Sequence, residues 1–320
     1  MAIPAGWSGR LRLPVVAAPM FLISGPDLVV ECCRSGVVGT FPALNQRTSE
    51  GYDAWLLQIA ERLADRPDAA PFGVNLVVHR SNPRLEADLE ITIRHRVPLV
   101  ITSLGLRRDL IDAVHSYGGI VFHDVTTLKF AEKAAAAGVD GLIAVTYGAG
   151  GHAGLISPFA AMHEIRKIFD GTLLLGGVMS TGRQIAAARL MGADMAYMGT
   201  RFMATRESMA VARQRQMILD ANAADIVYTP AVSGIPGNFL RASLAEAGKD
   251  PDDLTPPSEL NFGTVNKDIK AWRDLWAAGQ GVGAIDDLPP AAELVARMAD
   301  DYWAAAGNAN GDLTGGLRAA

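Results

Sequence analysis

Eight short apolar runs with helical segments between them occupy residues 14–198 of this 320-residue chain. The runs are continuously hydrophobic, which is typical of parallel strands that are covered on both faces. The segments between them show helical spacing, and two of these segments stop at Gly138 and Gly192. The predicted strands are Pro14–Ala18, Gly36–Thr40, Phe72–Leu76, Pro98–Thr102, Gly119–His123, Gly141–Val145, Leu173–Gly177 and Met195–Met198.

This repeated strand–helix pattern predicts an α/β fold, a closed (β/α)8 TIM barrel. Consecutive strands are separated by about the length of one βα unit. A doubly wound sheet is the alternative, but eight strands with no order-reversing break favour closure. We expect residues 1–222 to form the barrel, with its eighth helix over Arg201–Asn222.

The remaining residues, 223–320, predict a smaller C-terminal cap region. Residues Asp225–Val265 are rich in Pro, Gly and Asn and show weak periodicity, and Leu275–Asp287 is a glycine-rich loop. An amphipathic helix over Pro290–Ala306 is expected to pack on the barrel. Loops of this length in compact proteins are usually functional, so we expect the region to cover one end of the barrel.

Composition excludes several classes of function. The formal net charge is -5 and no run is dense in Lys or Arg, which argues against a nucleic-acid surface. No stretch reaches the roughly 18 apolar residues that span a bilayer, and the start lacks a secretory pattern, so we expect no membrane association and a cytoplasmic location. Adjacent Cys32 and Cys33 predict core thiols, with a redox pair as the alternative. No HExxH or CxxC motif indicates a metal site.

Glycines at two strand ends predict a phosphate site. In a barrel of this kind, chemistry lies at the carboxyl ends of the strands, and phosphates bind beyond strands seven and eight. Gly176 and Gly177 end the seventh predicted strand, and Met198, Gly199 and Thr200 end the eighth. Glycine lets an anion approach backbone N–H groups, although barrel turns also require glycine for structural reasons.

The loop after the sixth strand carries the candidate catalytic group. Gly148–Gly154 reads GAGGHAG, so a single imidazole, His152, lies among glycines at the end of a strand. Histidine suits proton transfer near neutral pH, although a lone histidine is more often structural. His123 ends the fifth strand beside Asp124 and is a second imidazole for the barrel mouth.

Two further strand ends contribute small or polar groups. The first strand ends in Ala18, Pro19 and Met20, which predict an apolar wall. Asn75 interrupts the apolar third strand with an amide that can both donate and accept hydrogen bonds. A buried amide that satisfies loop backbone is the structural alternative for Asn75.

In this order along the chain, the segments VVAAPM, FGVNLV, GAGGHAG, LLLGGVMSTGRQIAAARLMGADMAYMGTRFMATRE and WAAGQGVGAIDD resemble the nitronate monooxygenase (2-nitropropane dioxygenase-like) family. The resemblance covers nearly the whole chain, and residues 173–207 are its most specific part. It implies an FMN-containing barrel with an added smaller domain.

The resemblance also implies roles for the residues that match its motifs. His152 matches the catalytic histidine of the family. The other matching residues imply cofactor contacts: Ala18, Pro19 and Met20 along the isoalloxazine, Asn75 as a hydrogen-bond partner of the flavin, Gly150 and Gly151 against the cofactor, and Gly176, Gly177, Met198, Gly199 and Thr200 around its phosphate.

Three positions depart from the family pattern. The fourth strand ends in ITSLG with Ser103, where many nitronate monooxygenases have a histidine, and Val145 stands where many have Gln. Asp124 stands where a related branch of flavin quinone reductases has Lys. These departures bear on the reaction more than on the flavin site.

The expected activity is FMN-dependent oxidation of alkyl nitronates with molecular oxygen, with His152 as the base or orienting group and a small molecule as substrate. An NAD(P)H-dependent reductase of quinones or enoyl thioesters is the alternative, and a non-catalytic phosphate-binding barrel is a third reading. In the cap region, three side chains could either reach the site or pack the cap onto the barrel: Trp272, Trp276 and Gln280.

Overall fold

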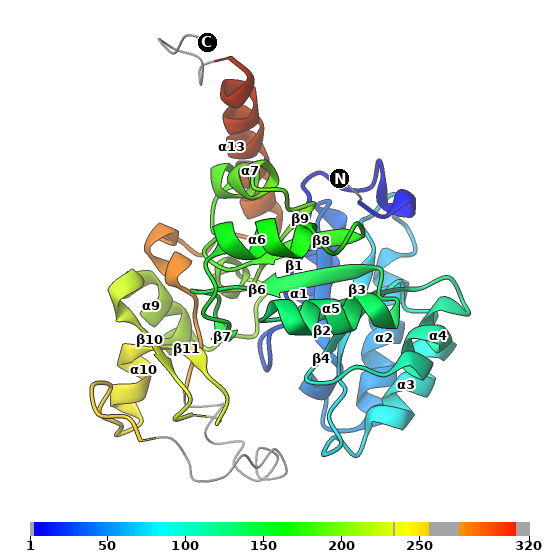
Figure 1. Ribbon diagram of the computed structural model, residues 1–320, viewed down its shortest axis with the longest axis horizontal. Helices are drawn as coiled ribbons and strands as arrows, with labels where there is room; N and C mark the ends of the chain where they lie inside the picture. Colours follow the sequence, from blue (N-terminus) through cyan, green and yellow to red (C-terminus); the bar gives the residue numbers. More distant parts are fainter. Residues whose placement is uncertain (1–2, 233, 256–274, 312–320) are drawn as a thin grey trace.

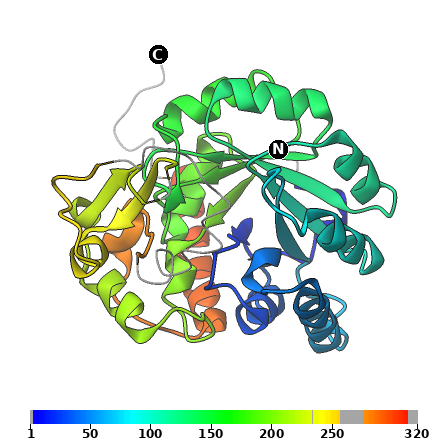
Figure 2. The same cartoon turned by 90° about the horizontal axis from the view of Figure 1, so that it is seen from below.

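The computed structural model describes residues 3–232, 234–255 and 275–311. Eight parallel strands close into a barrel in the order β1-β2-β3-β4-β5-β6-β8-β9, which confirms the predicted TIM barrel. Figure 2 shows the helices surrounding these strands. The barrel strands are β1 (Val15–Ala17), β2 (Val38–Pro42), β3 (Phe72–Val77), β4 (Leu99–Ser103), β5 (Ile120–Val125), β6 (Gly141–Val145), β8 (Thr172–Gly176) and β9 (Met195–Met198).

The helices follow the strands as the sequence pattern requires. Thr127 caps α5 by accepting a hydrogen bond from the Phe130 N–H, and Gly138 ends the helix in the left-handed conformation. The barrel helices are α1 (Pro26–Arg34), α2 (Ser49–Leu63), α3 (Leu85–Arg94), α4 (Arg108–His115), α5 (Leu128–Ala137), α6 (Pro158–Arg166), α7 (Gly182–Leu190) and α8 (Thr200–Met203). Short 3-10 turns lie at η1 (Ala5–Trp7), η2 (Ala43–Asn45), η3 (Ala223–Asp225) and η4 (Gln280–Ala284).

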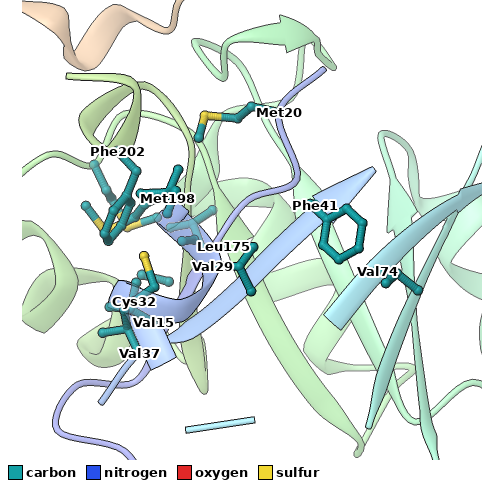
Figure 3. Close-up of a cluster of buried hydrophobic side chains, with 14 of the residues drawn as sticks. Val15, Met20, Val29, Cys32, Val37, Phe41, Val74, Leu175, Met198 and Phe202 are labelled. Carbon is teal, nitrogen blue, oxygen red and sulfur yellow. The ribbon is translucent and has the colours of Figure 1, made fainter. Parts of the chain in front are cut away.

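Side chains that alternate along the strands form two separate apolar layers. One layer fills the barrel interior, where the Trp7 and Phe122 ring centroids lie 5.7 Å apart. The other lies between the strands and the helices and includes both Cys32 and Cys33, which are buried free thiols, as expected for core residues. Figure 3 shows part of this outer layer. The interior layer consists of Trp7, Val16, Val38, Leu99, Ile101, Phe122, Ile143, Leu174 and Met195.

The prediction of one helix over Arg201–Asn222 is wrong. The chain forms α8, leaves the helical path at Ala204, and resumes in α9 (Ala212–Asp220). The hydroxyl of Thr205 donates to the Phe202 carbonyl at 2.8 Å, a local bond that competes with helix continuation. The backbone between α8 and α9 bonds to the loop after β1, where the Met209 N–H donates to the Ile23 carbonyl at 3.0 Å.

The weakly periodic segment after residue 225 contains regular structure that its composition did not indicate. Strands β10 (Ile226–Thr229) and β11 (Gly237–Leu240) form an antiparallel pair, followed by α10 (Arg241–Glu246). Strand β11 also pairs with a two-residue strand, β7 (Gly151–His152), from the loop after β6. The resulting three-stranded sheet lies beside the barrel in Figure 1.

The predicted C-terminal helix is present as α13 (Ala291–Gly311). It lies against α7 in Figure 1, and the two helices approach closely at Gly182. A Cβ at Gly182 would lie 2.1 Å from the Met298 carbonyl oxygen, so only glycine permits this approach. The Arg183–Asp301 ion pair joins the same two helices.

Candidate functional site

The loop between β6 and α6 is held at the carboxyl end of the barrel by its own backbone. Both the N–H and the hydroxyl of Thr146 donate to the Gly176 carbonyl at 2.9 Å, which extends the pairing between β6 and β8. Gly154 N–H donates to the Val145 carbonyl at 3.1 Å, so the loop returns to the end of the strand it left. The glycine-rich segment therefore projects from a fixed base.

A strand pair positions the backbone of His152. His152 lies opposite Gly237 in the β7–β11 ladder, and a Cβ at Gly237 would lie 2.7 Å from the Gly151 carbonyl oxygen. Burial lowers the pKa of His152 to about 4, so its imidazole is neutral near pH 7. A neutral imidazole can accept a proton or hydrogen-bond an oxygen atom of a bound molecule.

The glycine loop, β9 and the segment around Gly279 meet at one junction, in which Thr200 and Gly279 are buried and Gly150 is exposed. Gly279 N–H donates to the Thr200 hydroxyl at 2.9 Å, and Gln280 N–H donates to the Gly148 carbonyl at 2.9 Å. A Cβ at Gly150 would lie 2.8 Å from the Gly279 nitrogen and 3.1 Å from the Thr200 hydroxyl. The structure thus brings predicted residues Gly150 and Thr200 together.

Gly176 and Gly177 lie at the same edge, against the base of the glycine loop. Gly177 has a φ of 127°, which is unfavourable for other residues, and its Cβ would lie 2.8 Å from the Thr146 hydroxyl. The adjacent helix α7 begins with a capping box in which Thr181 and Gln184 bond each other's backbone N–H groups. The end of β8 and the loop after β6 are therefore neighbours.

The residues after β1 form a wall beside the end of β9. Ala18 N–H donates to the Met198 carbonyl at 2.9 Å, and a Cβ at Gly199 would lie 3.6 Å from the Met20 sulfur. Pro19, between them, is half-buried. The side chain of Met198 belongs to the outer core layer, as Figure 3 shows, so Met198 contributes its backbone to this edge.

Asn45 fixes the shape of that wall and was not anticipated from the sequence. Its amide nitrogen donates to the carbonyls of Met20 and Ser24, and its Oδ1 accepts from the Leu22 N–H at 2.8 Å. Leu22 has a φ of 61°, a strained value for a non-glycine residue. A short 3-10 turn in η2 places Asn45, and no motif marks it.

Asn75 faces the barrel interior and is nearly buried. Its amide nitrogen donates to the Ile101 carbonyl and to the Ser103 hydroxyl, both at 3.1 Å. Ser103 therefore occupies the strand-four position noted above and holds the amide of Asn75. The amide oxygen of Asn75 remains the group that could meet a bound molecule.

The expectation that His123 could point into the barrel mouth is wrong. The Thr102 hydroxyl and the His123 Nδ1 are 2.7 Å apart, and neighbouring Val121 and Val125 belong to the outer layer. Because side chains alternate along β5, His123 faces the helices and Asp124 faces the interior with Phe122. Burial lowers the pKa of His123 to about 4 and raises that of Asp124 to about 7.

Two buried oxygen atoms at this end have no hydrogen-bond partner: Oδ1 of Asp124 and Oδ1 of Asn238. Asn238, on β11, also went unnoticed in the sequence, yet its Nδ2 donates to the Ala149 carbonyl in the glycine loop at 2.7 Å. Unpaired buried acceptors are rare, and a donor from a ligand or an ordered water would satisfy them. A flavin carries ring N–H and ribityl hydroxyl donors that would satisfy the Oδ1 of Asn238, so this residue fits such a group.

Of the three cap residues considered in the sequence, Trp276 and Gln280 occupy different places in the structure. The side chain of Trp276 is partly buried and packs against the outer core layer, and its backbone N–H donates to the Ser243 hydroxyl at 2.7 Å, so Trp276 packs the cap onto the barrel. The side chain of Gln280 lies at Gly148, where a Cβ would be 3.0 Å from its Oε1. Trp272 lies outside the described residues.

Within the described residues, no group of three or more His, Cys, Asp or Glu side chains could hold a metal ion. The same part of the chain contains no helix whose length and apolar character would carry it across a membrane.

The chain is similar to known proteins over most of its length. The family model described as nitronate monooxygenase matches residues 9–301. A nitronate monooxygenase of Neurospora crassa is 28% identical, over 92% of this chain and 90% of that protein. An octahydro-indene-carboxyl-CoA dehydrogenase of Rhodococcus jostii is 24% identical, over 88% of this chain and 90% of that protein.

Solved structures show the same architecture. A nitroalkane oxidase from Streptomyces ansochromogenes superposes with a TM-score of 0.77 at 25% identity, over 93% of this chain and 97% of that chain. FabK from Thermotoga maritima gives a TM-score of 0.78 at 22% identity, over 95% and 96%. At this identity, the likeness to FabK concerns the fold alone.

Proposed function

Because the chain belongs to the nitronate monooxygenase family of oxidoreductases, we propose that it binds FMN at the carboxyl end of the barrel and oxidises alkyl nitronates with molecular oxygen. The observation that carries this proposal is the junction of Gly150, Thr200 and Gly279, beside which β7 holds His152. FMN would supply the electron-transfer chemistry there, while the protein supplies binding, orientation and proton control.

The proposal assigns the phosphate to the ends of β8 and β9. Backbone N–H groups near these glycines would bind the anion, and small residues leave room for its approach. The residues involved are Gly150, Gly151, Gly176, Gly177, Met198, Gly199 and Thr200. Ala18, Pro19 and Met20 would line one face of the ring, and Asn75 would bond its polar edge.

His152 would act on the substrate. Its imidazole is neutral near pH 7, so it could accept a proton or donate a hydrogen bond to the oxygens of a nitronate. The two-residue strand fixes its backbone, which limits the positions that the ring can take. This arrangement suits orientation of a small anion beside an electron acceptor.

The test uses the purified full chain reconstituted with FMN. Mixing it with an alkyl nitronate under anaerobic conditions should bleach the yellow flavin absorbance, and admission of oxygen should restore it. His163 lies exposed on α6, so His163→Asn provides a matched control that should bleach as the unsubstituted protein does. Failure of the flavin to bleach, or failure of the chain to take up FMN, would contradict the proposal.

A specific observation favours a second candidate, NAD(P)H-dependent reduction of an enoyl thioester or a quinone. Four exposed apolar side chains stand on four different βα loops at the barrel mouth, and an apolar rim suits a larger acyl or ring substrate: Phe21, Leu104, Tyr147 and Val178. Rapid anaerobic bleaching by NADH or NADPH alone, without bleaching by a nitronate, would favour this reaction.

A further inference from the structure

Four polar side chains interrupt the apolar interior of the barrel at its carboxyl end. Asn75 and Ser103 are hydrogen-bonded to each other, whereas Asp124 and Tyr197 belong to β5 and β9. Tyr197 packs against the interior apolar layer and is partly exposed. The interior layer next to these side chains is apolar, so they form a polar floor under the barrel mouth.

The strand register fixes Asp124 on this floor. Ile120 and Phe122 pack in the interior layer, and Asp124 follows them at the same two-residue interval. Its partner in the β5–β6 ladder is Ile143, which is also an interior residue. A carboxyl group therefore stands inside the barrel, near the carboxyl end of β5.

No cation of the described residues forms an ion pair with this carboxyl group. The interior positions beside it are Ile143, its ladder partner on β6, and Tyr197 from β9, of which only Tyr197 titrates. Burial raises the pKa of Tyr197 well above its usual value, and the Asp124 charge adds to this effect, so the phenol is neutral. Asp124 Oδ1 is buried and accepts no hydrogen bond.

An isolated buried carboxylate is costly, whereas a carboxylic acid is tolerated and can donate a hydrogen bond. We propose that Asp124 is a second ligand-binding residue of this site, whose protonated carboxyl group donates a hydrogen bond to an anionic substrate from the lumen side, while His152 acts from the loop side. This inference rests on the proposed function, because it takes the substrate to be a small anion. Below the pKa of Asp124 its neutral carboxyl group would favour anion binding, and above that pKa its carboxylate would repel the anion.

The first experiment needs neither flavin nor substrate. Infrared difference spectra of the full chain, compared with those of Asp124→Asn, should show a protonated carboxylic acid band at pH 6 that disappears by pH 8. Burial raises the pKa of Asp124 to about 7, so the band should lose half its intensity near that pH. A carboxylate already ionised at pH 6 would overturn the inference and leave the proposed oxidation of nitronates untouched.

The second experiment measures binding of nitrate, a planar anion whose charge is constant over this pH range, to the FMN-loaded protein. Its dissociation constant should rise about tenfold per pH unit above pH 7 in the unsubstituted protein. In Asp124→Asn the constant should be independent of pH, because the amide donates at every pH. Glu132→Gln, which removes an exposed carboxyl group on α5, is the matched control and should keep the pH dependence.

The outcomes separate the two proposals. Unchanged pH dependence in Asp124→Asn, or nitrate binding that ignores pH in the unsubstituted protein, would overturn the role of Asp124 even where nitronates bleach the flavin. Bleaching by NAD(P)H alone would refute nitronate oxidation, and the infrared band would still decide the protonation of Asp124.

Discussion

The hydroxyl of Thr200 accepts a hydrogen bond from the backbone N–H of Gly279 at 2.9 Å, inside the protein. This bond joins the end of the last barrel strand to the glycine-rich segment that precedes the C-terminal helix. The candidate phosphate site is therefore built from two distant parts of the chain. Its stability can be tested by removing the Thr200 hydroxyl.

Replacing Thr200 by Val should lower the free energy of unfolding by about 1–3 kcal/mol, because the Gly279 N–H then stays buried without an acceptor. Thr200→Ser keeps the hydroxyl and is the control, expected to cost less than half as much. Urea denaturation monitored by circular dichroism measures both. Equal losses for the two variants would show that the hydrogen bond contributes nothing.

Gly199→Ala should abolish or weaken FMN binding and leave the fold intact. The added Cβ would meet only ordinary contacts, 3.6 Å from the Met20 sulfur and 3.7 Å from the Ala18 Cβ, so the protein can accommodate it. It would nevertheless occupy space beside the wall where the ring is proposed to lie. Flavin fluorescence titration should show at least a tenfold weaker affinity, with the melting temperature unchanged. Unchanged FMN affinity in this variant would show that the flavin does not lie beside Gly199.

His152→Asn should reduce the rate of nitronate-dependent flavin bleaching by about 10²–10⁴-fold, the usual contribution of a general acid or base. Flavin affinity should stay the same, since the proposed contacts of the loop come from Gly150 and Gly151. Stopped-flow absorbance under anaerobic conditions provides the rate. If His152→Asn bleaches as fast as the His163→Asn control, a group other than His152 carries out the proton transfer.

The lowered pKa of His152 also predicts how stability depends on pH. Folding lowers this pKa from its ordinary 6.5 to about 4, so the unfolded chain binds the proton more tightly. The stabilisation from a neutral His152 is complete above pH 6.5 and is lost as pH falls towards 4. Between these limits, the unsubstituted protein should lose about 2 kcal/mol more than His152→Gln. Parallel losses in urea unfolding at pH 6.5 and 4.5 would contradict a buried neutral imidazole.

Two arginines that hold the C-terminal segment should differ sharply in importance. Arg201 is nearly buried and bonds both the carbonyl and the carboxylate of Asp287, whereas Arg183 is exposed where it pairs with Asp301. Arg201→Ala should lower the free energy of unfolding by about 3 kcal/mol. Arg183→Ala should cost at most about 1 kcal/mol. Chemical denaturation of the two variants measures both losses. An equal or larger loss in Arg183→Ala would contradict the prediction.

The barrel was predictable because each strand can be recognised from its own local sequence. A run such as Gly141–Val145 is apolar at every position, and its neighbours obey the same rule, so β6 has the predicted bounds. The capped helix α5 likewise follows from Thr127 and Gly138. Glycines and His152 could be assigned to the carboxyl end because that end is set by chain direction alone.

What the sequence did not reveal depends on register and on distant partners. Whether His123 or Asp124 faces the interior changes with a shift of one residue, and only the pairing of Asp124 with Ile143 decides it. The break after α8 follows from the bond between Met209 and Ile23, which no local pattern encodes. Asn238 acts through Ala149, far from it along the chain.

The pairing of His152 with Gly237 has a consequence for the order of events during synthesis. All eight barrel strands leave the ribosome before β11 does, so a nascent chain can complete its barrel while the imidazole has no strand to dock against. Contacts between such distant segments form late and slowly. Under the proposed function, an unfinished chain that lacks β11 would hold its barrel without a positioned His152, and the site would be complete only after β11 has been translated.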